Sequence, residues 1–287
     1  MDALRFIVDL AGCFEPGQVR IARTDEDMPA NPALEAMIAR TWDACLREAR
    51  VRDIELFNGR LARYLRHRVD GGMLIVEVGA TDYAAFLGTN YYNAYRAAEF
   101  GWENYANPLG TSATLITSDG WLLYGRRSRR VACHAGYVHT FGGGLEFAEV
   151  EPGSRCDVFG SVLRELREEV SLTADEVERM VCIGLIRDAA LRQPELIFDV
   201  HVRATRGQLE ARLEASTSAH EHDALVALRD EPEAAVPFIL AHRPIAPVAV
   251  GAICLHGLSR FGMAWYEATV CALWGRPAGE GSLRGGG

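Results

Sequence analysis

The sequence has 287 residues, of which 49% are hydrophobic, and a formal net charge of −9 at pH 7. This length and apolar content are enough for one large domain or two modest ones with a substantial core. The acidic balance argues against general binding to nucleic acid, which needs a basic surface. The longest weakly polar stretch, residues 244–258, is too short for a membrane span and contains two prolines, so no membrane partner is expected.

The N-terminal residues and the cysteines indicate a cytoplasmic protein. An acid stands at position 2 and no basic run precedes the first apolar residues, which predicts neither a secretory signal nor a transit peptide. The seven cysteines are scattered, without the close pairs typical of zinc or redox sites. We expect them to be reduced and mostly buried thiols.

The first part of the chain shows the patterns of an α+β domain. Asn31 is a suitable N-cap, and Pro32 a suitable first residue, for a helix over 31–50. Short helical stretches are expected at 81–88 and 91–106. Apolar runs predict strands at 5–14, 18–24, about 60–66 and 73–79. We place a domain boundary near Asn107, so that residues 1–107 form the N-terminal domain.

Residues 108–275 are expected to form a second domain, followed by a disordered tail. Apolar runs predict strands at 112–117, 121–127, 179–188 and 194–204. The turn Ser118-Asp119-Gly120 between the first two is typical of a hairpin. A charged helix is expected around 162–172 with Asp157 as its N-cap, and apolar helical stretches run from about 248 to 274. The tail, residues 276–287, has nothing to bury.

The charged helix, VLRELREEVSL, carries three glutamates within two turns. Glu165 lies three and four residues before Glu168 and Glu169, so the carboxylates occupy neighbouring rows of one helix surface. An apolar stripe on another face can anchor the helix to a core. Such charged helices are commonly solvated, but like charges this close repel, and divalent cations such as Mg²⁺ bind carboxylate oxygens. Upstream, Gly142-Gly143 follows an apolar run, where backbone can approach a phosphate group.

The stretch from Gly143 to Leu172 resembles the signature of the Nudix hydrolases. That signature reads glycine, five residues, glutamate, seven residues, and then Arg-Glu-aliphatic-x-Glu-Glu-x-Gly-aliphatic. Its second half is matched by Arg164, Glu165, Leu166, Glu168, Glu169 and Leu172. Glu149 stands six residues after Gly143 as the pattern asks, but seven extra residues separate it from Arg164, and Ser171 replaces the glycine.

Further stretches resemble one branch of that family, the UDP-glucose/UDP-galactose pyrophosphatases. They are TDYAAFLGTN (81–90), NPLGTSATLITSDGWLLYGRRSRRVA (107–132), GGGLE (142–146) and VLRELREEVSL (162–172). The resemblance covers residues 57 to 202. It implies an α/β fold, a Nudix α/β/α sandwich preceded by an α+β domain that helps to form the substrate pocket.

The resemblance also implies roles for individual residues. Glu165 and Glu169 would hold Mg²⁺, or Mn²⁺ in its place, with Glu168 next to them and Arg164 bracing the glutamates. Positions that correspond to substrate contacts are Phe57, Tyr83, Arg127, Ala132, His139, Gly144 and Glu146. His139 stands where the relative has a carboxylate, and Gly144 where it has a histidine, so the preferred nucleotide and sugar stay open.

The remaining candidates are weighed on their residues alone. Arg127 and Arg129 would share a face of an extended segment, and a guanidinium suits phosphate oxygens. Arg129 and Arg130 are taken as solvated. His220-Glu221-His222 lacks a further ligand at a suitable spacing, which argues against zinc. The roles of Glu149, Glu195 and Glu221 stay open.

The expected reaction is Mg²⁺-dependent hydrolysis of a nucleotide sugar, UDP-glucose or UDP-galactose, to UMP and a sugar 1-phosphate. Two alternatives remain: a Nudix pyrophosphatase for another nucleotide, such as ADP-ribose or a dinucleotide, and a sensor that binds a nucleotide sugar without cleaving it. The expected partner is thus a small molecule, and the sequence gives no oligomeric state.

Overall fold

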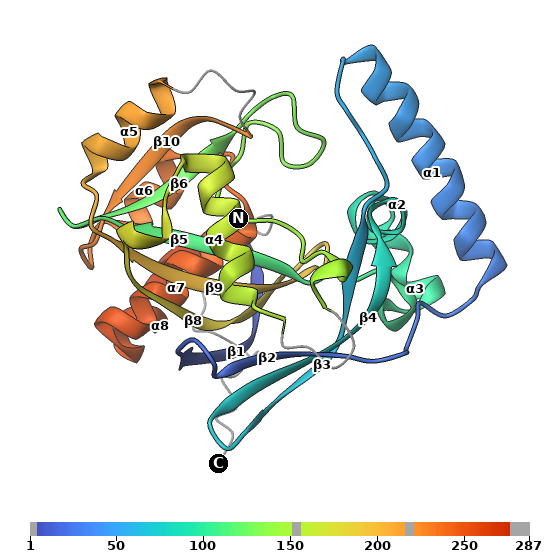
Figure 1. The fold of residues 1–287 in the computed structure, drawn as a ribbon, viewed down its shortest axis with the longest axis horizontal. Coiled ribbons are helices and arrows are strands. Elements are labelled where there is room, and N and C mark those ends of the chain that lie inside the picture. Colours follow the sequence, from blue (N-terminus) through green and yellow to red (C-terminus); the bar gives the residue numbers. More distant parts are fainter. Residues whose placement is uncertain (1–4, 151–155, 216–220, 276–287) are drawn as a thin grey trace.

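The computed structural model describes residues 5–150, 156–215 and 221–275. The predicted disordered tail lies outside these residues. Within the described ranges, no helix is both long enough and apolar enough to cross a membrane. Figure 1 shows a sheet with helices on both faces, and beside it a smaller unit that carries the long first helix.

The larger sheet has seven strands in the order β1-β8-β9-β5-β6-β10, and β7 pairs with β6. All its neighbouring strands run antiparallel except β5 and β9, which are parallel. Its strands are β1 (Phe6–Phe14), β5 (Gly110–Ile116), β6 (Trp121–Arg127), β7 (Val138–His139), β8 (Val177–Asp188), β9 (Pro194–Val202) and β10 (His222–Arg229).

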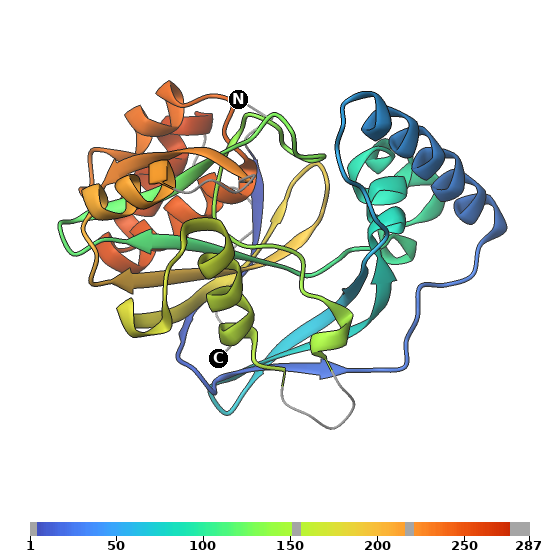
Figure 2. The same cartoon turned by 45° about the horizontal axis from the view of Figure 1, so that its top comes forward.

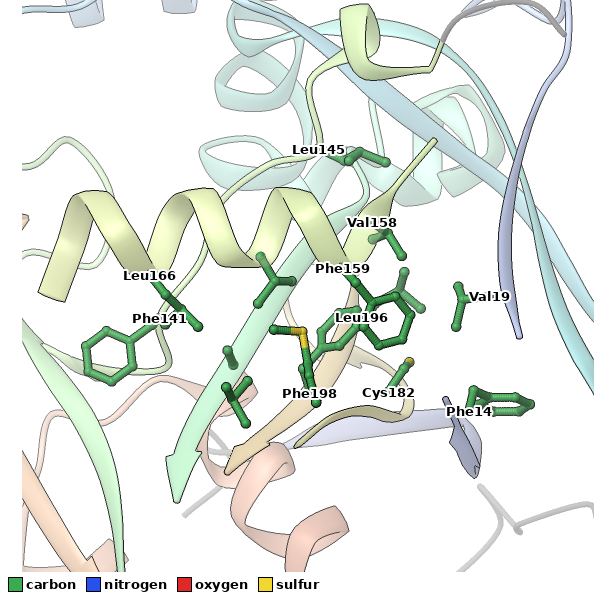
Figure 3. Packing of buried hydrophobic residues seen from close by; sticks show 14 of the residues in the cluster. Phe14, Val19, Phe141, Leu145, Val158, Phe159, Leu166, Cys182, Leu196 and Phe198 are labelled. Atoms are coloured by element: carbon green, nitrogen blue, oxygen red, sulfur yellow. The ribbon is translucent and has the colours of Figure 1, made fainter. Parts of the chain in front are cut away.

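Helices cover both faces of this sheet. One face carries α4 (Val158–Val170), whose Phe159 and Leu166 lie in a core with Phe198 of β9 (Figure 3). Burying each such side chain contributes roughly 1.5–3 kcal/mol, which outweighs a few tenths of a kcal/mol of repulsion between neighbouring glutamates. A second core joins the other face to α6 (Ala235–Ala241), α7 (Pro247–Phe261) and α8 (Met263–Trp274). The predicted α/β/α sandwich is therefore present.

The smaller unit is built on a three-stranded sheet with the order β2-β4-β3, in which β2 and β4 are parallel. Its strands are β2 (Val19–Arg23), β3 (Arg60–Asp70) and β4 (Met73–Asp82). Its helices are α1 (Pro32–Val51), α2 (Tyr83–Phe86) and α3 (Ala97–Phe100), and a π-helical turn over Leu87–Tyr91 continues α2. Figure 2 shows α1 on the side of this unit away from the larger sheet.

The predicted boundary at Asn107 needs one correction. β1 lies within 1–107, yet it pairs with β8 and forms an edge of the larger sheet. β1 pairs with the edge of β8, and its Phe6 packs against Gly251 of α7, so both backbone pairing and apolar contact hold β1 in the larger sheet. The chain therefore enters the larger sheet first, builds the smaller unit, and returns.

Several elements differ from the predictions. β3 extends to Asp70, because it pairs with β4 along its whole length. The single apolar stretch at 248–274 is two helices, which separate at Gly262 with a φ of +89°. The sequence reading did not anticipate α5 (Arg206–Ala215), α6 or β10. The N-caps of α1 and α4, Asn31 and Asp157, are confirmed.

Candidate functional site

The position of α4 sets the position of the glutamates. The Asp157 side chain accepts a hydrogen bond from the N–H of Gly160 at 3.0 Å and so fixes the start of the helix. The apolar stripe of the helix then faces the sheet, which turns Glu165 and Glu169 toward the glycine segment that follows β7. Glu168, on the next row, is exposed.

Glu169 is a buried carboxylate held by two polar contacts. Only 7% of the residue is exposed. Its Oε2 accepts a hydrogen bond from the N–H of Gly142 at 3.0 Å, and its Oε1 lies 3.3 Å from Nε2 of His222. Burial raises the pKa of Glu169 to about 8, the charge of Glu221 adds to this rise, and the Gly142 N–H and the Arg127 charge oppose it. Burial thus favours the uncharged form of this carboxyl group.

Glu165 lies on the same side of α4, next to Gly143. Its Oε1 accepts a hydrogen bond from Arg164 at 2.8 Å. Burial raises the pKa of Glu165, Arg164 opposes the rise, and the charge of Glu169 adds to it. A side-chain carbon added at Gly143 would lie 3.1 Å from Oε2 of Glu165. The glycine therefore keeps this carboxylate accessible.

The backbone at Gly142 can only be built with glycine. Its φ is +126°, and a Cβ there would lie 2.2 Å from the carbonyl oxygen of Thr111. The N–H of Thr111 donates to the carbonyl of Gly143 at 2.9 Å, which ties the segment to β5. This close approach to β5 aims the Gly142 N–H at Glu169.

Arg127, at the end of β6, connects the glutamates with the smaller unit. Its Nε donates to the carbonyl of Cys133 at 3.1 Å, and a terminal nitrogen lies 3.2 Å from Glu221. The positive charge of Arg127 also lowers the pKa of Glu169, of His139 and of Tyr83. Arg127 thus lies between Glu221 and the loop at Cys133 that contacts Tyr83.

The smaller unit contributes aromatic side chains. The hydroxyl of Tyr83 lies 3.3 Å from Sγ of Cys133, and the hydroxyl of Tyr91 accepts from the N–H of His134 at 3.1 Å. Phe57 is 74% exposed, an unusual position for a phenyl ring, on the loop between α1 and β3. Both tyrosines face the loop after β6 that also binds Arg127.

The other predicted substrate positions lie at different places around Arg127 and the two tyrosines. His139 has its ring centroid 5.6 Å from that of His134. Gly144 pairs with Gly110, and Glu146 with Leu61 of β3. Ala132 lines a cavity of about 20 Å³ beside α1, room for about one water molecule. A larger cavity of about 670 Å³, between β3 and the end of β8, contains none of the predicted site residues.

Sequence reasoning missed some of the residues that meet here. His222 contacts Glu169 although it opens β10, because antiparallel pairing with β6 brings it opposite Arg127. Glu195, left open by the sequence, accepts a hydrogen bond from Ser112, far from α4 in sequence. No spacing rule relates such residues, since sheet register alone brings them together. The side chain of Glu149 and the whole of His220 lie outside the described residues.

The donor set suits a hard divalent cation. Glu165 and Glu169 offer carboxylate oxygens next to the backbone of Gly142-Gly143, and such oxygens are the ligands of Mg²⁺. Burial is the main cause of the raised pKa of both carboxyl groups, and a bound cation would oppose that rise. Among the described residues, no three His, Cys, Asp or Glu side chains converge closely enough to hold a metal ion by themselves. A cation here would draw its remaining ligands from backbone, water or substrate.

Comparison with known proteins identifies relatives. No family model matches the chain. The uridine diphosphate glucose pyrophosphatase NUDT22 of Homo sapiens is 28% identical over 208 residues, which are 65% of this chain and 69% of that protein. Its Mus musculus counterpart is 26% identical over 210 residues, or 64% and 67%. Nudix hydrolase 9 of Arabidopsis thaliana is 24% identical over 225 residues, or 64% and 69%.

Solved structures show a more limited overlap. The Caenorhabditis elegans Ap4A hydrolase is 16% identical and has a TM-score of 0.34, over 53% of this chain and 96% of that one. The assignment therefore rests on the curated relatives, which agree with the motif at Arg164–Glu169. Together, the curated relatives and this motif support a Nudix hydrolase similar to the uridine diphosphate glucose pyrophosphatase NUDT22.

Proposed function

We propose that the chain hydrolyses the pyrophosphate of a UDP-sugar, UDP-glucose or UDP-galactose, to UMP and a sugar 1-phosphate. The observation that carries this proposal is the position of Arg127: its Nε donates to the carbonyl of Cys133, and Sγ of the same cysteine lies 3.3 Å from the hydroxyl of Tyr83 in the smaller unit. A substrate that contacts both units would place anionic phosphates near Arg127 and a flat ring near the aromatic side chains of the smaller unit. A nucleotide sugar has that form.

Glu165 and Glu169 would hold the divalent cation, Mg²⁺ or Mn²⁺. When bound, such an ion supplies positive charge that neutralises the pyrophosphate and activates water. The Gly142 N–H holds one oxygen of Glu169, and Arg164 holds one oxygen of Glu165, so each carboxylate keeps a fixed direction. This preorganisation lowers the cost of assembling the charged site.

The other residues orient the substrate. The Arg127 guanidinium would bind phosphate oxygens through paired N–H groups. Tyr83, and the exposed ring of Phe57, offer flat surfaces for a pyrimidine. In the reaction, the oxygen of water forms a bond to one phosphorus, the bond from that phosphorus to the bridging oxygen breaks, and the second phosphate leaves. The products are UMP, the sugar 1-phosphate and released protons.

The test is to incubate the purified protein with Mg²⁺ and a panel of UDP-sugars, ADP-ribose and dinucleotides, and to identify the products. Formation of UMP and sugar 1-phosphate is expected, with loss of turnover in EDTA. Cleavage of adenine nucleotides alone would refute the uridine assignment. A UDP-sugar that binds but is never cleaved with Mg²⁺ present would instead favour the sensor.

A further inference from the structure

Three hydroxyl and carboxyl groups form a hydrogen-bonded chain that ends at His139. Ser112 and Thr140 are each 1% exposed. Ser112 Oγ donates to Oε2 of Glu195, and Thr140 Oγ1 donates to Ser112 Oγ at 2.9 Å. Nδ1 of His139 lies 3.2 Å from Thr140 Oγ1. The four residues come from β5, β9 and the segment that begins with β7, so the fold assembles a chain that no local motif would produce.

The direction of this chain is fixed by its end. An ionised carboxylate can only accept, so the single proton of the Ser112 hydroxyl is used on Glu195. Thr140 must then use its own proton on Ser112, and its oxygen is left to accept from Nδ1 of His139. The carbonyl oxygen of Thr140, 3.0 Å from the same Nδ1, also accepts only. Two independent contacts therefore place the proton of His139 on Nδ1.

The His139 ring is partly buried, and the proposed function takes it as a substrate contact. Burial, together with the charges of Arg127 and His134, lowers the pKa of His139 well below its usual value. Its ring lies beside His134, whose backbone N–H binds the hydroxyl of Tyr91. Within the described residues, Nε2 of His139 makes no hydrogen bond. A neutral imidazole with its proton on Nδ1 presents Nε2 as a lone-pair acceptor.

We propose that Glu195, Ser112 and Thr140 are positioning residues that hold His139 as a neutral hydrogen-bond acceptor for an N–H of the substrate base. The imide N–H of uracil satisfies this acceptor, whereas the ring nitrogen of cytosine at that position carries a lone pair and is rejected. The proposal rests on the proposed function for its location, and it names the chemistry by which one pyrimidine is chosen over the other.

The tautomer is measured on the protein alone. Correlated ¹H–¹⁵N spectra of the histidine rings at pH 8, where Glu195 is ionised, should show His139 with a protonated Nδ1 and an unprotonated Nε2. The signals are assigned by their loss in His139→Gln. Burial raises the pKa of Glu195 to about 7 against its Ser112 hydrogen bond, which is the reason for the chosen pH. A ring protonated at Nε2 would overturn the proposal without any variant.

Binding of UMP and CMP, the probes for base choice, is then compared by calorimetry in wild type and variants. Thr140→Val removes the hydroxyl but keeps the shape, and we expect the preference for UMP to fall about tenfold, the equivalent of one oriented hydrogen bond. Glu195→Gln retains an acceptor and should retain most of the preference, whereas Glu195→Ala should lose it. A uniform drop in affinity, with the UMP-to-CMP ratio unchanged, would contradict the proposal.

The matched control is Thr114→Val. Thr114 is fully buried on the same strand as Ser112, but its hydroxyl faces the Tyr124 hydroxyl at 3.5 Å. It should leave the UMP-to-CMP ratio unchanged. Equal changes in the two threonine variants would show a structural effect only, and failure to bind either nucleotide would overturn the assigned ligand. Absence of UDP-sugar cleavage, with tautomer and base preference as expected, would refute the proposed reaction but not this inference.

Discussion

Glu169 is buried, although the neighbouring charges of Glu221 and Glu168 oppose its ionisation. We expect Glu169→Gln to lower turnover by about 10²–10³-fold, because the amide cannot replace an anionic ligand. The fold should persist, since the glutamine can still accept from the Gly142 N–H. The measurement is the steady-state rate against Mg²⁺ concentration, together with melting in EDTA. Exposed Glu267→Gln on α8 is the control, and near-normal turnover in the Glu169 variant would disprove the metal assignment.

At Gly142, the clash that a Cβ would make can be distinguished from the strain of its positive φ. Gly142→Ala should lower the free energy of unfolding by roughly 2–4 kcal/mol, because the new Cβ meets the Thr111 carbonyl in addition to the backbone strain. Gly136 has a φ of +78° with open space around it, so Gly136→Ala should cost only about 1–2 kcal/mol. Urea denaturation measures both. Equal losses would show that backbone strain alone matters at Gly142.

At the scale of elements, the end of α4 shows why the family motif has glycine at the position of Ser171. Ser171 is the C-cap of the helix in the left-handed region, with φ 54° and ψ 33°. The N–H groups of Ser171 and Leu172 donate back to the carbonyls of Arg167 and Leu166. Glycine adopts this conformation without strain, so Ser171→Gly should raise stability by about 1 kcal/mol. Thermal melting checks this, with Ser171→Ala as the control that keeps the Cβ; a loss with glycine would contradict it.

A buried histidine links α7 to β9 and to the residue after β10, and it makes stability depend on pH. His256 lies 2.8 Å from Asp199 and 3.1 Å from Asp230. Burial lowers the pKa of His256, but the two carboxylates outweigh burial and raise it to about 10. Because the folded pKa exceeds the unfolded value of about 6.5, this contribution is complete below pH 6.5 and is lost as pH rises toward 10.

We therefore expect His256→Gln to destabilise the fold by about 3–5 kcal/mol at pH 6, as loss of a buried ionic partner does. The difference from wild type should shrink steadily between pH 6.5 and 10. Urea unfolding at several pH values measures it. A difference that stays constant over this range would mean that His256 is neutral in the native state.

At the scale of the whole molecule, β1 precedes residue 107 in the chain but lies in the larger sheet. A fragment of residues 108–275 would leave the edge of β8 unpaired and the surface of α7 under Phe6 uncovered. Exposed edges of this kind promote aggregation. We expect the fragment to be insoluble or strongly destabilised. Joining residues 5–16 to it through a flexible linker should restore solubility in gel filtration, and equal behaviour of the two fragments would show that β1 is dispensable.

Much of the fold and part of the site could be read from the sequence. The strands that pair with neighbours at short range, and the helix α4 with its cap, follow from periodicity and turn chemistry. β10 and α6 escaped detection, because β10 has a mixed burial pattern and α6 is short. The placement of β1 escaped for another reason: nothing in an apolar run says which of two sheets it will join.

The sequence by itself determined the acidic end of α4, the glycine segment and the arginine after β6, because helical spacing and residue chemistry are local properties. It also supplied the motif that relates the chain to the Nudix hydrolases. Only the tertiary structure decided that Gly142 binds Glu169, that His222 lies beside it, and that Glu195 reaches His139 through two hydroxyls. These contacts depend on strand order and register, which the burial of the whole sheet selects and no short segment encodes.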